Sequence, residues 1–391
     1  MDLEAFTPSQ KEYLVDIKGV DPRSGRDYKH KAYFAPPLPD KVELAGKTWT
    51  LVAETTHTLG KLSQASGAMP NPALFRAPTI RREAQSTSAL EGTFAPFEAV
   101  MEADVNPDAT AASPQLREVR NYVTAAEAAL EWIVDRPISV SMLCELQRIL
   151  VTGTRSEALD PGQIRTRQVI VGPEGSPIEL ARFVPPPPGP ALEEAMRDWQ
   201  AWITKEIPLP SIVSAAMAHY QFEALHPFAD GNGRIGRLVI ILQLVRARTL
   251  ANGSLSLSPW FEARRAAYQD QLLAVSTSGD LEPWIAFFCE GVRARAEAMI
   301  EQMESLRGYQ AEMRELARVG RWRGTIVHVI EDLIGRPFIT ARSLSTQYGV
   351  TVQAAYGVIE RLTNAGVLRE LTGRAYDQVF AAPRVLELLQ S

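Results

Sequence analysis

The sequence predicts a mainly α-helical protein that carries one small β-hairpin and ends in a winged helix-turn-helix domain. Three observations lead to this fold class. Most of the chain after residue 50 has apolar residues at helical spacing. Two short β-like runs within residues 168–184 flank a turn rich in Gly and Pro, which is a hairpin signal inside a helical chain. After residue 320, three short helical patterns precede a second hairpin, the order typical of a winged helix-turn-helix.

The composition is that of an ordinary soluble protein with more than one domain. The chain has 391 residues, of which 46% are hydrophobic and 22% are charged, and its formal net charge is -5. This length suits two or three domains, and the negative charge argues against a protein dominated by nucleic acid or anionic membrane. Cys144 and Cys289 are too few for a zinc site or a disulfide framework. No stretch has the length of a membrane span or the layout of a signal peptide, so we expect a cytoplasmic protein without membrane contact.

The first half of the chain divides into an arm, several helices and the hairpin. Residues 1–48 are rich in Pro, Asp, Lys and Tyr without clear periodicity, which predicts an irregular arm that wraps the core. Gly67 ends the first predicted helix, and Gly92 ends the second. The predicted helices cover residues 50–66, 80–90, 115–135 and 139–152. The predicted hairpin strands are 168–171 and 178–184.

The second half is helical up to the C-terminal domain. Its predicted helices cover residues 190–205, 211–225, 233–249, 259–276 and 281–319. Nearly every position from Leu238 to Val245 is apolar, so this helix should be buried on all sides as the central helix. After Gly320, the helices of the predicted winged helix-turn-helix cover residues 321–334, 343–348 and 351–364.

One loop of twelve residues, 226–237, has the features of an anion-binding site. Its sequence is His-Pro-Phe-Ala-Asp-Gly-Asn-Gly-Arg-Ile-Gly-Arg. Gly231, Asn232 and Gly233 tolerate left-handed backbone angles, so successive N–H groups can converge on an anion at the start of the central helix. Arg234 and Arg237 share one face of that helix and oppose its dipole, which makes sense if they bind polyanionic oxygens.

The same loop offers a metal ligand and a base. Asp230 lies at the edge of the glycine turn, where a carboxylate beside phosphate oxygens suits Mg²⁺. His226 precedes the turn, within reach of the proton of a nucleophile. A lone histidine, a Gly-Asn-Gly turn or an arginine pair is usually structural. Their ordered combination within twelve residues favours a site for phosphoryl or nucleotidyl transfer.

The loop resembles the motif of the Fic family, His-x-Phe-x-(Asp/Glu)-Gly-Asn-Gly-Arg-x-x-Arg, at every specified position. The segments around Ala218, Trp260 and Asp280 also look like that family, so the resemblance covers roughly residues 50 to 295. Fic enzymes transfer AMP from Mg-ATP to a Tyr, Thr or Ser hydroxyl of a protein. The resemblance therefore implies a Fic-type helical bundle, ATP as substrate, Mg²⁺ as cofactor and a protein partner with a hydroxyl side chain.

The resemblance also implies a role for each residue of the loop. His226 would be the catalytic base, and Asp230 would be the Mg²⁺ ligand. Glycine at position 233 favours AMP transfer, because the related Doc-type kinases carry a lysine there and bind ATP the other way round. The residues that would contact the ATP phosphates are Gly231, Asn232, Gly233, Arg234 and Arg237.

A glutamate upstream of the loop resembles the inhibitory residue of the same family. The run from Thr87 to Gly92 fits the pattern (Ser/Thr)-x-x-x-Glu-(Gly/Asn) on a helix. Paired with Arg237, Glu91 would occupy the guanidinium group that holds the γ-phosphate, and ATP would bind weakly or out of line. The implied domains are an N-terminal arm and inhibitory-helix region (1–110), a Fic catalytic core (111–295), a linker helix (296–320) and a winged-helix domain (321–391).

Two other functions stay open at this point. If Glu91 positions a water, the enzyme would remove AMP from modified targets. Alternatively, the chain is a DNA-binding transcriptional regulator with a Fic-like nucleotide-sensing domain. Residues 321–391 hold eight arginines against six acids, with Arg361 on the predicted recognition helix and Arg369 and Arg374 on the wing, a sparse footprint for DNA.

The family resemblance extends to the hairpin and to partners. The segment 164–184 resembles the family's flap, whose edge could pair with a strand of the protein target. Self-modification and homodimer formation are further expectations from the family.

Overall fold

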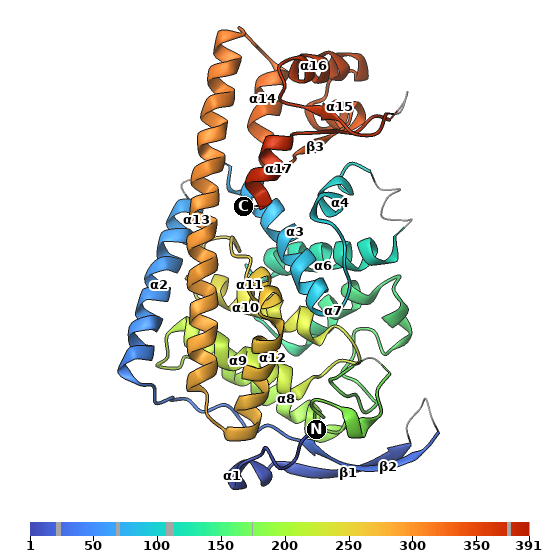
Figure 1. Ribbon diagram of the computed structural model, residues 1–391, viewed down its shortest axis with the longest axis vertical. Helices are drawn as coiled ribbons and strands as arrows, with labels where there is room; N and C mark the ends of the chain where they lie inside the picture. The colour runs from blue at the N-terminus through green and yellow to red at the C-terminus, as the bar shows by residue number, and fades with distance from the viewer. Residues whose placement is uncertain (21–24, 68–70, 107–112, 174, 374–376, 391) are drawn as a thin grey trace.

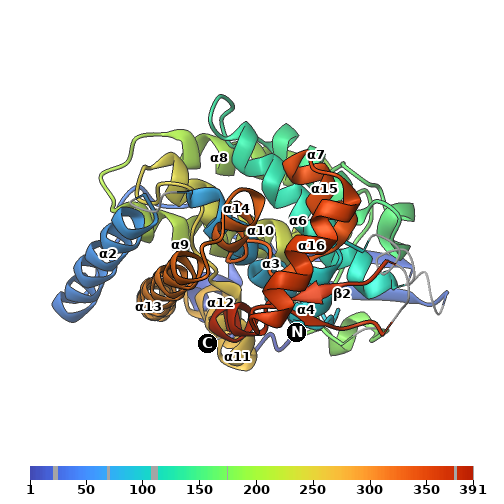
Figure 2. The ribbon, with the colours of Figure 1, turned by 90° about the horizontal axis from the view of Figure 1, so that it is seen from above.

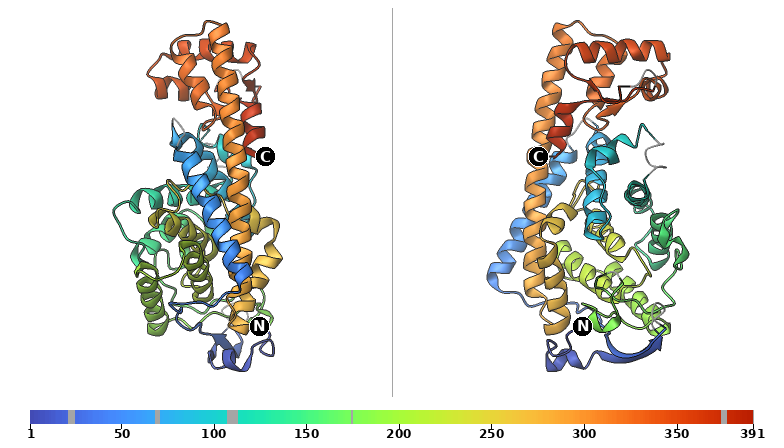
Figure 3. Two further views of the ribbon diagram at one scale, coloured as in Figure 1. Left: turned by 90° about the vertical axis from the view of Figure 1, so that its left-hand side faces the viewer. Right: turned by 45° about the vertical axis from the view of Figure 1, so that its right-hand side comes forward.

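The computed structural model describes residues 1–20, 25–67, 71–106, 113–173, 175–373 and 377–390. The protein is mainly helical, as predicted, and elongated (Figure 1). Two helices, α2 (Gly46–Gly67) and α13 (Glu282–Val319), run side by side in the same direction along one side of the molecule (Figures 1 and 3). Their first turns are tied together, because the Glu282 carboxylate accepts hydrogen bonds from Thr48 Oγ1 at 2.5 Å and from Ala45 N at 3.0 Å.

Two consecutive helices form the centre of the body. They are α9 (Ser211–Leu225) and α10 (Asn232–Arg246). Figure 2 shows α10 near the middle of the body, with other helices around it. Leu238, Val239 and Ile240 are at most 2% exposed, so the buried central helix predicted from the unbroken apolar run is confirmed. The helices packed around this pair include α6 (Pro114–Trp132), α7 (Val140–Val151), α8 (Pro190–Thr204) and α12 (Arg265–Ser278). Helix α11 (Ser258–Ala263) packs against α12 and α13.

The predicted single helix at 259–276 is in fact two helices. The chain leaves helical geometry at Arg264, where φ is −125°, and α11 and α12 meet there. The Arg264 guanidinium lies over the ring of Trp260, 4.5 Å from the ring centroid. No sequence signal such as Pro or Gly marks this break.

The N-terminal arm contains regular structure that the sequence did not predict. After α1 (Pro8–Lys11), strands β1 (Leu14–Val20) and β2 (Asp27–Tyr33) pair in antiparallel register, with Leu14 opposite Tyr33. The prediction of an irregular arm was wrong for these residues. The alternation is weak because most of the hairpin is solvent-facing, and burial is complete only at Ala32 and Tyr33. The hairpin lies across one end of the body (Figure 1).

Helix α3 (Pro72–Leu90) is eight residues longer at its start than the prediction of 80–90. The Asn71 side chain accepts a hydrogen bond from Ala73 N at 3.2 Å and caps the helix, and Pro72 occupies its first turn. Pro78 lies inside the helix, two residues before the predicted start at residue 80. A proline there removes one helical hydrogen bond, the one that would reach the Leu74 carbonyl, and the helix continues past it. The short helix α4 (Phe97–Glu102) follows α3.

The predicted hairpin at 168–184 is reduced to one β-bridge. Val171 and Phe183 exchange two backbone hydrogen bonds, of 2.9 and 3.0 Å. In the described part of this segment the pairing does not extend beyond this bridge. Proline at 173 and 177 cannot donate to a ladder, which limits the pairing. The remainder is loop with the 3₁₀ turn η2 (Ile178–Leu180), and another 3₁₀ turn, η1 (Arg155–Ala158), lies upstream. We call residues 164–173 and 175–184 the flap.

The C-terminal module comprises residues 325–373 and 377–390. Its elements are α14 (Thr325–Asp332), β3 (Phe338–Ile339), α15 (Ala341–Tyr348), α16 (Val352–Asn364), β4 (Arg369–Glu370), β5 (Phe380–Ala381) and α17 (Pro383–Gln390). The strands form one sheet in the order β3-β5-β4. Strand β3 and helix α17 were not predicted, Arg374 lies outside the described residues, and the winged helix-turn-helix assignment stays a prediction. Among the described residues, no helix is both long and apolar enough to cross a membrane.

Candidate active site

The loop between α9 and α10 is shaped by two residues with left-handed backbone angles. His226 ends α9 with φ 50°, and Gly231 caps α10 with φ 85°. Gly231 suits this position for two reasons. Its φ favours glycine, and a Cβ on it would approach Leu150 Cδ2 to 2.8 Å. The glycine turn predicted from the sequence therefore corresponds to a real geometric requirement.

Asn232 closes the loop on itself. Its Oδ1 accepts a hydrogen bond from Phe228 N, and its Nδ2 donates one to Phe228 O, both at 2.8 Å. The residue is 2% exposed, so both ends of its amide are committed to the backbone of the loop. In this conformation Asn232 holds the loop in shape, and its predicted contact with phosphate stays a prediction.

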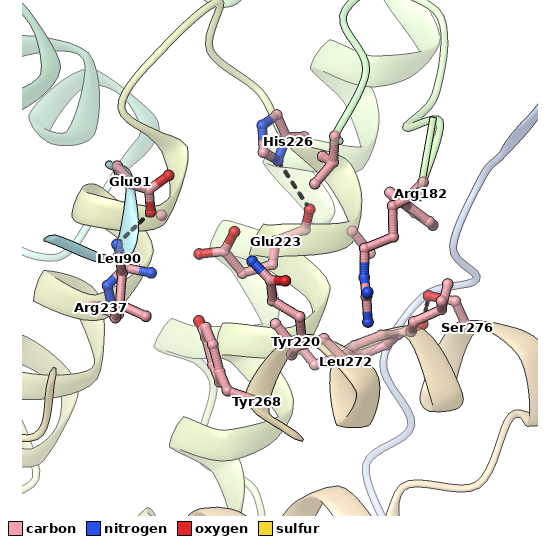
Figure 4. A pocket seen from close by; sticks show the side chains of 16 residues that line it. Leu90, Glu91, Arg182, Tyr220, Glu223, His226, Arg237, Tyr268, Leu272 and Ser276 are labelled. Atoms are coloured by element: carbon pink, nitrogen blue, oxygen red, sulfur yellow. Dashed lines mark hydrogen bonds and ion pairs between the residues drawn. The ribbon is translucent and has the colours of Figure 1, made fainter. Parts of the chain in front are cut away.

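His226 is held by backbone contacts and is neutral at neutral pH. Its Nδ1 lies 3.3 Å from the Glu223 carbonyl (Figure 4), which favours the tautomer with the proton on Nδ1 and a free lone pair on Nε2. The Arg165 Nε donates to the His226 carbonyl at 2.8 Å. Burial, together with the charge of Arg165, lowers the pKa of His226 to about 4. A neutral imidazole is the form that can accept a proton.

Arg234 and Asp230 form a pair at the start of α10. Arg234 Nη2 lies 3.2 Å from Asp230 Oδ2, and its Nη1 lies 3.8 Å from Glu118 Oε2. Arg234 is 4% exposed, and its Nε has no hydrogen-bond acceptor among the described residues. Burial opposes ionisation of Asp230, but Arg234 and hydrogen bonds from the Ser156 side chain and the Gly231 backbone lower its pKa below the usual value. Asp230 is therefore an ionised carboxylate at the edge of a cationic site.

Arg237 is held by contacts with Thr87 of α3 and with Glu91 at the end of that helix. Its Nε donates to Thr87 Oγ1 at 2.7 Å, and its Nη2 donates to Thr87 O at 3.1 Å and to Glu91 Oε1 at 2.5 Å (Figure 4). Burial opposes ionisation of Glu91, but the charge and hydrogen bond of Arg237, with the charge of Arg234, lower the pKa of that carboxyl. Glu91 and Arg237 are 146 positions apart in the chain and form an ion pair here, as the resemblance implies.

Gly233 lies directly beneath this ion pair. A Cβ at position 233 would collide with Glu91 Oε1 and would lie 2.9 Å from both terminal nitrogens of Arg237. Any other residue at this position would therefore displace Glu91 or the Arg237 guanidinium. The absence of a side chain at position 233 is thus required by the paired conformation itself.

A cavity of about 120 Å³ lies between His226 and Arg237. Its walls come from α3, the flap, α9, α10 and α12, and include Tyr220, Glu223, Tyr268 and Leu272 (Figure 4). Ligand pockets for whole small molecules are usually about 300–1,000 Å³. This cavity is smaller, and Glu91 and Arg237 line one end of it.

Glu223 is a wall residue of this cavity that sequence reasoning missed. Its Oε1 is buried without a hydrogen-bond partner among the described residues, and its side chain is 14% exposed. Burial raises its pKa to about 7, the charge of Arg237 opposes this, and the charge of Glu91 adds to it. Its position three residues before His226 was the available signal, since residues so spaced share one helical face.

The comparisons with known proteins agree with this geometry. The sequence model of the Fic/DOC family matches residues 137–244, and that of the Fic/DOC family N-terminal region matches residues 49–131. The first of these contains the whole of the loop 226–237, and the second contains α3 and Glu91.

The curated relatives of this chain include protein adenylyltransferases. Protein adenylyltransferase fic-1 of Caenorhabditis briggsae is 29% identical over 197 residues, covering 48% of this chain and 35% of the relative. Protein adenylyltransferase fic-1 of Caenorhabditis elegans is 30% identical over 170 residues, covering 43% of this chain and 30% of the relative. The chain thus spans about a third of the length of the curated relatives it matches.

Among solved structures, a Fic family protein from Desulfovibrio desulfuricans G20 shares the fold. The TM-score is 0.56 at 20% identity, with 89% of this chain and 98% of that chain covered. By the two matched models, residues 49–131 are a Fic/DOC family N-terminal region and residues 137–244 are a Fic/DOC family domain.

Proposed function

We propose that the protein transfers AMP from ATP to the hydroxyl of a Tyr, Thr or Ser residue of a protein, and that Glu91 holds it in an inactive state. The observation that carries this proposal is the ion pair between Glu91 and Arg237. Arg237 is the last residue of the loop 226–237, which matches every specified position of the Fic motif. The names of the curated relatives, which are protein adenylyltransferases, support the reaction type.

His226 is the base of the proposed reaction. Its Nε2 accepts the proton of the target hydroxyl, and the hydroxyl oxygen forms a bond to the α-phosphorus of ATP. The bond from that phosphorus to the bridging oxygen of the β-phosphate breaks, and pyrophosphate leaves. The low pKa of His226 keeps the imidazole neutral at neutral pH, and the Glu223 carbonyl fixes its orientation.

The remaining residues of the loop bind the nucleotide in this proposal. The backbone N–H groups of Gly231 and Gly233, with the first turn of α10, face the phosphates, and Arg234 neutralises their charge. Asp230 fits a Mg²⁺ site that is completed by phosphate oxygens, because it is ionised and its side chain is 38% exposed. When bound, Mg²⁺ would neutralise charge on the phosphates.

Glu91 acts as the brake by occupying Arg237. The guanidinium of Arg237 uses three hydrogen bonds on Thr87 and Glu91, so it has no free fork for a γ-phosphate. Without that contact ATP is held weakly, or with its α-phosphate out of line with the attacking oxygen. Movement or removal of Glu91 frees the arginine and enlarges the cavity.

Removal of AMP from a modified protein is the second candidate function. Glu91 and His226 line the same cavity, so Glu91 could orient a water whose oxygen bonds to the phosphorus of a phosphodiester. His226 Nε2 accepts the proton of that water and passes it to the target oxygen as the bond from this oxygen to phosphorus breaks. Loss of Glu91 distinguishes the two candidate functions. It would activate AMP transfer, but it would abolish AMP removal.

The first test is transfer of α-labelled AMP from Mg-ATP, with intact mass of the protein as a second readout for self-modification. The variants are wild type, Glu91→Gly and Glu91→Gly/His226→Ala, each mixed with a cell lysate as a source of targets. We expect strong label in Glu91→Gly, little in wild type and none in the double variant.

Arg76→Ala is the matched control, because this exposed side chain lies on the same helix as the brake and makes no contact with the loop. It should behave as wild type. If Glu91→Gly binds ATP but labels neither itself nor any lysate protein, the transferase proposal is wrong. Loss of AMP from a labelled protein with wild type but not with Glu91→Gly would favour the second candidate.

A further inference from the structure

A second cavity lies on the other side of α9 from the candidate active site. Its volume is about 430 Å³, and its walls come from the N-terminal arm, α8 and α9. Tyr220 lines the first cavity and Gln221 lines the second, so consecutive residues of α9 separate the two. We call this space, defined by residues 12–15 and 34–38 of the arm, α8 from Ala191 to Trp202, and Gln221, the arm cavity.

The arm wall is fixed in place by contacts with the core. Gln221 Nε2 donates to the Pro36 carbonyl at 3.0 Å. Tyr33 N donates to the Val184 carbonyl at 2.9 Å, and the Tyr33 ring packs on Phe183. The arm cavity is therefore a preformed space that begins where the arm meets the base of the flap.

The charged side chains that line the arm cavity are all acidic. Glu12, Glu194 and Asp198 line it, and its described lining contains no lysine or arginine. Within the described part of the chain, none of these three carboxylates forms an ion pair or hydrogen bond, whereas the neighbouring Glu193 lies 3.9 Å from Arg197. Such a set of carboxylates attracts a cationic ligand and excludes an anionic one.

Aromatic side chains also line the arm cavity, and one of them has an N–H donor without a hydrogen-bond partner among the described residues. Tyr13 is 37% exposed, while Trp199 and Trp202 are buried. The Trp199 Nε1 donates to the Ala218 carbonyl at 2.9 Å, but the Trp202 Nε1 is buried without an acceptor among the described residues. An indole N–H is a donor only, so a ligand in the arm cavity could supply an acceptor to Trp202.

We propose that the arm cavity binds an extended, basic segment of a protein partner. The guanidinium or ammonium groups of the segment neutralise Glu12, Glu194 and Asp198, and its cations can stack on the aromatic walls. A backbone carbonyl of the segment accepts from Trp202 Nε1. The alternation of cations with carbonyls is what a peptide offers and a simple cation lacks. A partner bound here is held beside the flap.

The test uses the full-length protein and a capped six-residue peptide of alternating Arg and Ala as the probe. Binding is measured by titration calorimetry, with an alternating Glu and Ala peptide and spermidine as comparison ligands. We expect saturable binding of the basic peptide only. The double variant Glu194→Gln/Asp198→Asn should weaken it by about tenfold or more, because exposed charges at the rim are replaced by neutral isosteres.

Two further variants separate this site from general surface charge. Glu193→Gln changes the adjacent residue on the same helix, which does not line the arm cavity, and should leave affinity within about twofold of wild type. Trp202→Phe keeps a ring but removes the N–H, and should weaken binding of the basic peptide. The proposal is overturned if Glu193→Gln weakens binding as much as the double variant, if spermidine competes as well as the peptide, or if no ligand binds.

Discussion

Glu223 shows how a single buried residue can make stability depend on pH. It faces the cavity beside Arg237 and Tyr268, and its Oε1 has no partner among the described residues. Burial raises its pKa from an ordinary 4.5 to about 7. An acid with a raised folded-state pKa holds its proton more tightly when folded, so its contribution to stability is greatest below about pH 4.5 and is lost as the pH rises through 7.

The variant Glu223→Gln cannot ionise and should remove this dependence. The free energy of unfolding of the variant minus that of wild type should be larger at pH 8 than at pH 5 by roughly 1–3 kcal/mol, so the variant is relatively more stable at pH 8. Urea unfolding at both pH values measures this difference. Glu193→Gln, which changes an exposed glutamate, should show the same difference from wild type at both pH values. An equal effect of Glu223→Gln at pH 5 and pH 8 would contradict the raised pKa.

Helix α3 is the element that positions Glu91, the proposed brake, and a buried glutamate anchors this helix. Glu83 Oε2 accepts hydrogen bonds from Ser258 N at 2.9 Å and from Ser256 Oγ at 3.1 Å, and its Oε1 accepts from Ser258 Oγ. Glu83 is 4% exposed. It therefore connects the middle of α3 to the start of α11, two turns before Glu91.

Removing this anchor should loosen the brake. Glu83→Ala leaves the buried N–H of Ser258 without its acceptor, which should lower the free energy of unfolding by about 1–3 kcal/mol. Amide hydrogen exchange at the C-terminal end of α3 should become faster, and AMP transfer by the otherwise wild-type chain should rise. Arg76→Ala on the same helix should change none of these three quantities. Unchanged exchange at residues 87–91 would show that Glu83 does not position the brake.

At the scale of the whole molecule, the C-terminal module lies against the start of the braking helix. Figure 3 shows α3 running from that module into the body, and a Cβ at Gly335 would lie 2.5 Å from the Leu74 carbonyl. This carbonyl has lost its helical donor to Pro78, so Gly335 closes on the irregular first turns of α3. Gln390 also donates to the Glu98 carboxylate at 2.6 Å, across the same boundary.

Gly335→Ala should therefore disturb both stability and the brake. The added methyl group meets backbone atoms that cannot rotate away, which should cost about 1–3 kcal/mol and lower the midpoint of thermal unfolding. AMP transfer should increase, since α3 carries Glu91 at its other end. Gly357→Ala in α16, where a Cβ has nothing within 4 Å, is the control and should leave both readouts near wild type. Equal unfolding midpoints for the two variants would contradict the close packing.

Several parts of the molecule could be predicted because their causes are local. The buried central helix follows from an unbroken apolar run, and the left-handed turn before it follows from Gly231. Several helix ends marked by Gly, Pro or a capping side chain were found within a few residues, but the start of α3, marked by Asn71 and Pro72, was missed. Where local signals were weak or misleading, prediction failed, as in the arm hairpin, the first turns of α3 and the break at Arg264.

The sequence by itself determined the chemistry of the loop 226–237, because residues twelve or fewer positions apart must lie together when a turn and a helix hold them. The tertiary structure alone decided which distant groups reach that loop. It placed Thr87 and Glu91 on Arg237, turned Glu223 into the cavity wall, and left Trp202 without an acceptor beside three carboxylates. The physical reason is that burial, pKa shifts and unpaired donors arise from packing between elements far apart in the chain, which local pattern does not encode.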